Sequence, residues 1–206
     1  MQPIGDNARG DAPPDGSFRD GIVALGGNLP LDGRSPAETL RAAVATLSDR
    51  GVEVTARSHL YRTPAFPPGS GPDFANAVVQ VRTTTAPGTI LTLLHEIEAA
   101  FGRVRDQRWG PRSLDLDLIA LGDVILPDAD THAEWRALPP EVQGTRVPDR
   151  LILPHPRVQD RAFVLIPLAD AVPGWHHPVT GQSVAELVAG LPEADRQSVI
   201  ALDQRV

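Results

Sequence analysis

Two aspartates, Asp115 and Asp117, stand two residues apart in an apolar stretch of the 206-residue sequence. Side chains alternate between the faces of a strand, so both carboxylates point the same way while Leu114, Leu116 and Leu118 point into the core. Two unpaired carboxylates this close repel each other, and the pKa of one would rise. A magnesium ion removes that penalty, and a hard cation held by few protein oxygens suits a nucleotide's phosphates. The spacing therefore predicts a platform for magnesium ions, reasonably a pair of them.

The segment just before this pair is rich in arginine, in a protein whose net charge is −7. Four arginines fall within ten residues: Arg103, Arg105, Arg108 and Arg112. Guanidinium groups match phosphate oxygens through two parallel hydrogen bonds. Phosphoryl transfer requires positive side chains beside a metal platform, because its catalysis is mainly positioning and charge neutralisation. An alternative stays open, in which these arginines simply pair with the two aspartates.

Composition restricts the remaining chemistry. All 19 basic residues are arginine, which excludes a lysine-bearing phosphate loop. The absence of cysteine excludes disulfides, zinc–thiolate sites and a thiol nucleophile. The acidic balance argues against nucleic-acid binding, and no apolar run approaches the roughly 18 residues of a membrane span. The first 19 residues lack the apolar region of a secretory signal, so a cytoplasmic enzyme is expected.

Strand and helix patterns interleave along the chain. Strands are expected at 22–25, 52–56, 77–81 and 113–121, and helices at 35–51 and 87–101. Ser35 with Glu38, and Ser183 with Glu186, form capping boxes that begin two helices. The hairpin-like pair at 52–60 and 75–83 indicates antiparallel pairing. We therefore expect an α+β protein, a ferredoxin-like α/β sandwich whose central, mostly antiparallel sheet is flanked by helices.

One domain is expected over residues 20–206, after a flexible N-terminal tail at 1–19 that is rich in proline and glycine. Residues 127–149 show no clear periodicity and are interpreted as an insertion. The loops at 63–72 and 103–112 are expected to act as lids that close on a ligand and exclude water. His176 and His177 have no carboxylate at metal-ligand spacing, and we expect them on the surface.

At the two aspartates the sequence resembles a known family. Residues 108–117, Arg-Trp-Gly-Pro-Arg-Ser-Leu-Asp-Leu-Asp, are similar to the signature of the 6-hydroxymethyl-7,8-dihydropterin pyrophosphokinases of folate biosynthesis. The resemblance continues in family order through about residues 20–190. Its weaker segments are 24–28, 61–64, 72–76, 97–98, 102–105 and 153–157, followed by Arg161 and Phe163.

The resemblance implies roles for residues that bind metal and nucleotide. Asp115 and Asp117 would hold two magnesium ions that bridge the phosphates of ATP. Arg103 and Arg112 would close over the reacting phosphates. The other implied ATP contacts are Arg105, Arg150, His155 and Arg161. Glu98 matches a family position where a structural brace is expected rather than chemistry.

The resemblance also implies a site for the reduced pterin. Asn76 would hydrogen-bond the pterin edge, Phe163 would stack on the ring and Trp109 would close over it. Thr63, Pro64 and Phe66 would supply backbone contacts and a wall. Phe74 replaces the tyrosine common in the family, so its wall role is kept and a hydroxyl contact is lost. Aromatic faces and one amide suit a flat, hydrogen-bonding ring.

The implied reaction is attack of the pterin hydroxymethyl oxygen on the β-phosphorus of ATP, with AMP as the leaving group. ATP and the pterin are the expected partners, and the expected oligomeric state is a monomer or weak homodimer. One alternative is another magnesium-dependent kinase or phosphohydrolase that acts on a small alcohol. The other is a non-catalytic binding module on the same scaffold.

Overall fold

The computed structural model describes residues 17–65, 69, 71–102, 112–139, 142 and 146–206. Its strands form one antiparallel sheet in the order β5-β1-β4-β3-β6, with β2 also paired to β4. The strands are β1 (Arg19–Gly27), β2 (Glu53–Arg57), β3 (His59–Thr63), β4 (Phe74–Thr83), β5 (Asp115–Leu121) and β6 (Ile200–Arg205). The predicted antiparallel α+β sandwich is confirmed.

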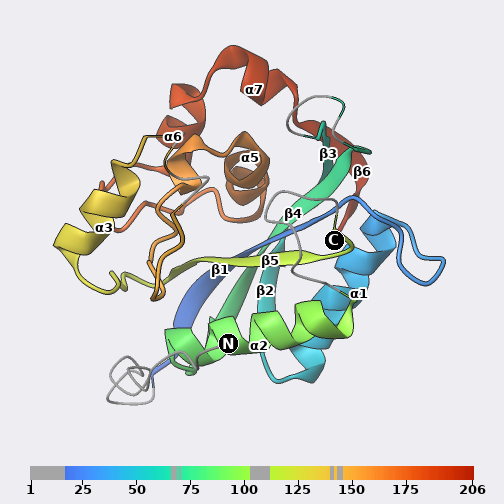
Figure 1. Ribbon diagram of the computed structural model, residues 1–206, viewed down its shortest axis with the longest axis horizontal. Helices are drawn as coiled ribbons and strands as arrows, with labels where there is room; N and C mark the ends of the chain where they lie inside the picture. Colours follow the sequence, from blue (N-terminus) through green and yellow to red (C-terminus); the bar gives the residue numbers. More distant parts are fainter. Residues whose placement is uncertain (1–16, 66–68, 70, 103–111, 140–141, 143–145) are drawn as a thin grey trace.

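Helices cover both faces of this sheet (Figure 1). On one face lie α1 (Pro36–Asp49) and α2 (Pro87–Ala100), which pack on Val23, Leu25 and Val79. On the other lie α5 (Ala162–Ala171) and α6 (Val184–Gly190). The remaining helices are α3 (Ala129–Arg136), the 3-10 turn η2 (Val158–Asp160) and α7 (Glu193–Gln197). In the part of the chain that the structure describes, no helix could span a membrane.

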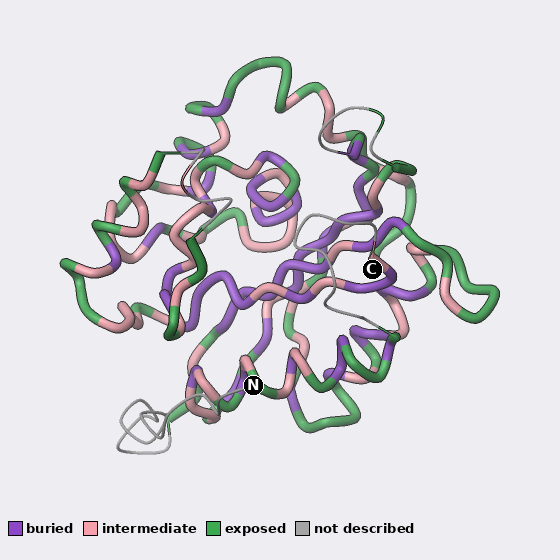
Figure 2. The backbone as a smooth tube through the Cα atoms, in the orientation of Figure 1, coloured by how far each residue is buried: buried purple, intermediate pink, exposed green. Residues whose placement is uncertain are grey.

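The sheet separates two hydrophobic cores, and buried residues follow its strands through the centre of the molecule (Figure 2). The larger core contains Leu40, Leu94 and Leu116, which are 0–2% exposed. The smaller core joins Ile119 to Leu165 and Leu168 of α5. Because alternate residues of one strand face opposite cores, β5 can bury its leucines under α2 and turn its aspartates toward the α5 side.

The predicted capping boxes exist at both helix starts. The Ser35 hydroxyl accepts from the Glu38 N–H at 3.4 Å, and the Glu38 carboxylate accepts from the Ser35 N–H at 2.7 Å. Ser183 and Glu186 make the same reciprocal pair at the start of α6. These hydrogen bonds satisfy backbone donors that the first turn of a helix leaves free. They hold the pKa of both glutamates below its ordinary value.

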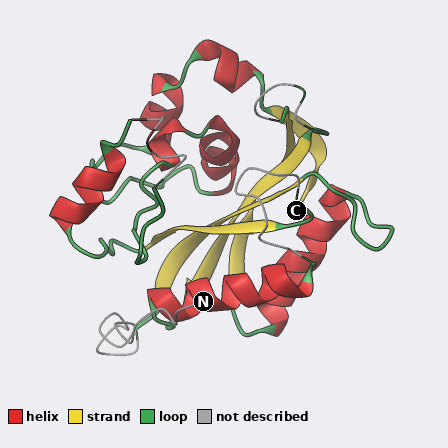
Figure 3. Cartoon of the chain, in the orientation of Figure 1, coloured by secondary structure: helices red, strands yellow, loops and turns green. Residues whose placement is uncertain are grey.

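The second half of the chain shows a helix that was not expected and overturns one expectation. Within residues 127–149 lies α3, which has no apolar periodicity because His132 is its buried residue. Asp128 caps this helix by accepting from the Thr131 N–H at 2.8 Å. His177 is only 1% exposed, whereas its neighbour His176 is exposed as predicted. The residue types alone did not predict the contact between the His132 and His177 rings, which joins α3 to the 175–184 segment. Figure 3 shows α3 among loops on the side of the sheet that α5 covers.

The buried His177 predicts a pH-dependent stability. Burial, then the nearby His132 and Arg136, lower the pKa of His177 from 6.5 to about 4. As pH falls from about 6.5 to about 4, the unfolded state therefore binds a proton first, and the free energy of unfolding should fall by up to about 3 kcal/mol.

The measurement is chemical denaturation at pH 7 and at pH 4.5. His177→Asn should lose less stability than the wild type over this interval, because the asparagine Oδ1 can still accept from the backbone but does not titrate. His176→Asn is the matched control and should behave like the wild type. An equal loss in His177→Asn would contradict the prediction.

Candidate active site

Asp115 and Asp117 lie on one face of β5, as their spacing predicted. They are partly exposed, while Leu114, Leu116 and Leu118 are 0–3% exposed on the opposite side. The Asp115 Oδ2 accepts from Nη1 of Arg112 at 2.7 Å, and the Asp117 Oδ2 accepts from Nη1 of Arg161 at 3.4 Å. Each carboxylate therefore has an arginine beside it, which reduces the repulsion between the two acids.

These ion pairs match one alternative from the sequence, in which arginines pair with the aspartates. The pairing does not exclude a ligand, because 25% of the Asp115 side chain and 40% of the Asp117 side chain remain exposed. Arginine and phosphate carry opposite charge, so these guanidinium groups are also suited to phosphate oxygens. The arrangement thus places two partly exposed carboxylates beside two arginines.

The strand register places a polar row across the sheet beside this pair. Asp115 of β5 is opposite Gly26 of β1, which is opposite Asn76 of β4. One strand separates the acid from the amide, which is about 10 Å. A Cβ on Gly26 would lie 3.1 Å from the Asn76 Oδ1. The missing side chain at Gly26 therefore leaves the space between the acidic pair and Asn76 open.

The residues expected to bind the pterin gather around Asn76. Asn76 and Thr63 are 5% and 7% exposed, and the Asn76 Nδ2 donates to the Thr63 Oγ1 at 2.7 Å. Thr63 is opposite Phe74, which is partly exposed, and Pro64 follows at the exposed end of β3. The hydrogen bond to Thr63 fixes the orientation of the Asn76 amide. The structure therefore brings Asn76, Thr63 and Phe74 together on the sheet face that carries the aspartates, with Pro64 next along the chain.

The start of α5 approaches the same face. Arg161, which contacts Asp117, also lies over the Phe163 ring, with 5.8 Å between its Cζ and the ring centroid. Phe163 is 40% exposed, so it is not an ordinary core residue. At the other end of α5, the Asp170 Oδ2 accepts from the His59 backbone at 2.6 Å and contacts its Nδ1 at 2.9 Å. This contact ties α5 to β3 and so holds Arg161 and Phe163 in place.

Asp170 and its neighbour Tyr61 both have shifted pKa values. Burial alone would raise the pKa of Asp170, but the hydrogen bonds from His59 and the charge of Arg205 hold it below its ordinary value. Burial and the neighbouring Asp170 raise the pKa of Tyr61 to about 12. Because its pKa is raised, Tyr61 stays neutral. It is opposite Asn76 in the strand register, so this neutral side chain lies beside the amide.

His155 also belongs to this cluster, but Arg150 does not. Burial and the charge of Arg161 hold the pKa of His155 well below its ordinary value, while the nearby Asp115 opposes that shift. The His155 Nδ1 accepts from the Arg157 N–H at 3.1 Å, so the ring proton of its neutral form lies on Nε2. Arg150 pairs instead with Asp149 at 3.3 Å, at an exposed position. The structure gives it no contact with the two aspartates.

Asn28 is a site residue that sequence reasoning did not single out. Its Oδ1 accepts from the Arg112 N–H at 2.9 Å, and its Nδ2 donates to the Pro72 carbonyl at 3.1 Å. Its own N–H donates to the Arg112 carbonyl at 2.9 Å. Asn28 thus joins the end of the 63–72 loop to the arginine that contacts Asp115. The signal was an asparagine directly after the Gly-Gly end of β1.

Glu98 of α2 fits the predicted role of a brace. It is 1% exposed, and its Oε1 accepts from the Leu116 N–H at 2.8 Å, between the two aspartates in sequence. Glu98→Ala should therefore cost about 2–4 kcal/mol of stability, because it leaves this donor unpaired and opens a cavity.

The matched control for Glu98 is Glu96→Ala on the same helix. Glu96 is exposed and pairs with Arg50 at 3.4 Å, so its loss should cost less than about 1 kcal/mol. Urea denaturation of both variants tests this difference. Similar stabilities for the two variants would show that Glu98 is not a brace.

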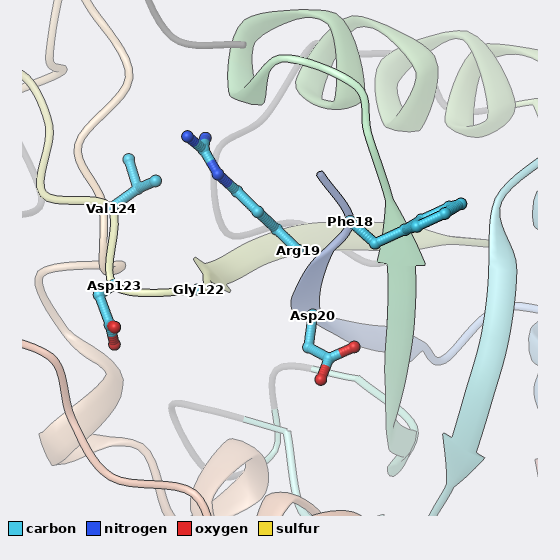
Figure 4. A pocket seen from close by; sticks show the side chains of 6 residues that line it. All are labelled: Phe18, Arg19, Asp20, Gly122, Asp123 and Val124. Atoms are coloured by element: carbon cyan, nitrogen blue, oxygen red, sulfur yellow. The ribbon is translucent and has the colours of Figure 1, made fainter. Parts of the chain in front are cut away.

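Four of the residues assigned to the site by sequence lie outside the described residues: Phe66, Arg103, Arg105 and Trp109. Their roles stay predictions, as do those of the two expected lids. A shallow hollow elsewhere is bordered by residues 18–20 and 122–124 (Figure 4). It lies at the opposite end of β1 and β5 from Asp115, so it is separate from this site.

The fold and the side chains define a class of protein: an α+β sandwich with a pair of aspartates, adjacent arginines and an amide–aromatic group gathered on one face of its sheet. Comparison with known families gives the particular one. Residues 22–173 match the model of 7,8-dihydro-6-hydroxymethylpterin-pyrophosphokinase (HPPK). The chain belongs to this family.

Curated relatives agree with this assignment. The chain is 38% identical over 169 residues to the 2-amino-4-hydroxy-6-hydroxymethyldihydropteridine pyrophosphokinase of Synechocystis, covering 81% of this chain and 73% of the relative. It is also 38% identical to the Pseudomonas aeruginosa enzyme of the same name, covering 82% and 90%.

A solved structure supports the fold. The crystal structure of Plasmodium falciparum HPPK-DHPS superposes with a TM-score of 0.59 at 14% identity, over 88% of this chain. The chain spans 44% of that longer protein.

Proposed function

We propose that this protein transfers the diphosphate of ATP to the hydroxymethyl group of 6-hydroxymethyl-7,8-dihydropterin and releases AMP, a step of folate biosynthesis. The observation that carries the proposal is the polar row across the sheet. It sets the acidic pair and Asn76 on one face, with Gly26 between them. Membership of the HPPK family supports the choice of both substrates.

The residues present suit magnesium. Asp115 and Asp117 offer carboxylate oxygens, and the described residues contain no group of three or more possible metal-ligating His, Cys, Asp or Glu side chains. The remaining ligands would have to come from phosphate oxygens and water, which is the usual way that magnesium binds with a nucleotide. We propose two ions. When bound, they would neutralise phosphate charge and orient the reacting groups.

The other side chains of the site fall into two groups, one for the phosphates and one for the pterin. Arg112, Arg161 and the Nε2–H of His155 would bind phosphate oxygens as negative charge spreads in the transition state. Asn76 and Thr63 would hold the pterin edge, and Phe74 and Phe163 would hold its faces. Arg103, Arg105, Trp109 and Phe66 keep their predicted roles, and Pro64 keeps its predicted backbone contact. Arg150 keeps only the weaker prediction of an ATP contact.

The reaction balances without a strong base. A bond forms between the hydroxymethyl oxygen and the β-phosphorus, and the bond from the β-phosphorus to the α,β-bridging oxygen breaks. AMP leaves with that oxygen, and the hydroxymethyl proton passes to water or phosphate. The protein contributes alignment and charge stabilisation, which account for most of the catalysis in this type of reaction.

The test is to incubate the purified protein with ATP, magnesium and the hydroxymethyl-dihydropterin, and to separate the nucleotides by chromatography. Pterin-dependent AMP is the expected product. ADP in its place would identify an ordinary kinase and overturn diphosphate transfer. No pterin-dependent turnover would overturn the substrate. The monomeric or weakly dimeric state, the cytoplasmic location and the tail at 1–19 stay predictions.

A further inference from the structure

The insertion contacts the chain on both sides of His155. Leu126, just before it, exchanges backbone hydrogen bonds with Leu153 at 2.9 and 3.2 Å. Near its other end, the Leu138 carbonyl accepts from Nη1 of Arg157 at 3.4 Å. Between these two points, His132 of α3 reaches the Pro154 carbonyl through its Nε2 at 3.0 Å. The insertion therefore encloses the segment that presents His155 to the site.

The contact of His132 falls on one particular peptide group. The carbonyl of Pro154 and the N–H of His155 belong to the same peptide, and that N–H donates to the Ile119 carbonyl at 2.7 Å. Ile119 is two residues beyond Asp117 on β5. The peptide before His155 is thus held from one side by the strand of the acidic pair and from the other by His132. Loss of either hydrogen bond would free the peptide to rotate and would redirect the His155 side chain.

The protonation of His132 follows from its partner. A carbonyl oxygen can only accept, so the Nε2 of His132 must carry a proton, and in the neutral ring its Nδ1 is an acceptor. Burial lowers the pKa of His132, which favours this neutral form. Its ring is 0% exposed, on a helix whose other residues are exposed or partly exposed.

The ring of His177 packs against the ring of His132. The two rings meet edge to face with centroids 6.2 Å apart. The His177 Nδ1 accepts from the Val179 and Thr180 N–H groups at 3.1 and 3.3 Å, which fixes the orientation of the His177 ring. Among the described residues, the His132 Nδ1 and the His177 Nε2 have no hydrogen-bond partner, so His177 supports the His132 ring by packing and not by a hydrogen bond.

We propose that His132 is a positioning residue for the nucleotide contact of His155, through its hydrogen bond to the Pro154 carbonyl, and that the His177 ring packs against the His132 ring and keeps it in this orientation. This inference rests on the proposed function, because the role of His155 does. The proposal assigns a function to residues 127–149: their helix α3 supplies the side chain, His132, that holds one peptide group of the proposed ATP site.

Two amide variants test the hydrogen bond at nearly constant polarity. The nitrogen of His132→Gln can reach the place of the histidine Nε2, whereas the side chain of His132→Asn is too short. Binding of a non-hydrolysable ATP analogue with magnesium is measured by calorimetry. We expect His132→Asn to weaken binding about tenfold and His132→Gln to stay within about twofold of the wild type, because small displacements at a site have large effects. His176→Asn is the exposed control and should bind like the wild type.

Three measurements separate the possible outcomes. Equal affinities for the Asn and Gln variants, whether both tight or both weak, would overturn the positioning role. In steady-state assays, His132→Asn should lower kcat/KM for ATP about tenfold and His132→Gln should stay within about twofold of the wild type; an unchanged kcat/KM in His132→Asn would also overturn the positioning role. Nitrogen-15 NMR of the wild-type protein identifies which ring nitrogen of His132 carries the proton, and it does not depend on a variant that folds. A proton on Nδ1 would contradict the hydrogen bond from Nε2 to the Pro154 carbonyl. A wild type that binds the analogue but makes no AMP would overturn the proposed function alone.

Discussion

Asp117→Asn should reduce AMP formation at least about a thousandfold while the protein stays folded. The variant keeps the size of the side chain but removes one of the two carboxylates of the metal platform, and metal-assisted stabilisation of phosphate charge accounts for several kcal/mol of the barrier. Stability should change by less than about 1 kcal/mol, because the Asp117 side chain is 40% exposed and its ion pair with Arg161 is 3.4 Å long. Removing one acid also relieves its repulsion with Asp115.

The readouts for Asp117→Asn are AMP formation over a magnesium series and the thermal unfolding midpoint. Asp123→Asn is the matched control, because Asp123 is exposed beyond the far end of β5 and should leave turnover unchanged. Asp115→Asn should act in the same direction as Asp117→Asn and also release Arg112. If Asp117→Asn kept more than a tenth of wild-type turnover, the metal assignment would be wrong.

Gly27→Ala should destabilise the protein by about 2–4 kcal/mol, a large effect for one methyl group. A Cβ at this position would lie 2.4 Å from the carbonyl oxygen of Ser113. The obstacle is backbone, which cannot turn aside as a side chain can. Ser113 is 9% exposed and its hydroxyl donates to the Phe101 carbonyl at 2.7 Å, so the segment is held on its other side as well. The strain would displace Arg112, which directly precedes Ser113, and Asp115, which lies two residues after it.

Urea denaturation and AMP formation together test the effect of Gly27→Ala. Both should fall, because the same displacement strains the fold and moves the metal platform. Gly190→Ala is the control, since a Cβ there meets nothing within 4 Å. Wild-type stability in Gly27→Ala would contradict the prediction and show that the Ser113 backbone can shift at little cost. Reduced stability with full turnover would show that this contact does not position the active site.

Much of the fold could be predicted because its signals are local. The helices at 35–51 and 87–101 were expected within a few residues of α1 and α2, since capping boxes and apolar spacing act over one or two turns. Several of the described helices were not predicted, α3 and α5 among them. The buried side of α3 is a histidine, and α5 is apolar almost throughout, so neither shows an amphipathic period.

The site divides in the same way. The shared face of Asp115 and Asp117 was predictable, because alternation along a strand is a property of the backbone. The hydrogen-bond partners of the site residues could not be predicted from the sequence in the same way. Arg161 is 44 residues from Asp117, and Asn28 reaches 84 residues forward to Arg112. Such contacts depend on which strands and helices become neighbours in the folded protein. Local sequence patterns do not show those neighbours.

By itself, the sequence determined the chemistry that the protein can perform: carboxylates paired on a strand, arginines in place of lysine, and the ten-residue signature at 108–117. Only the tertiary structure decided that Asn76 and Asp115 face the same space across Gly26, and that His132 of α3 contacts the peptide before His155. The physical reason is the range of the interactions. Periodicity and capping operate between near neighbours, whereas a site is made of side chains that only the packing of distant elements brings together.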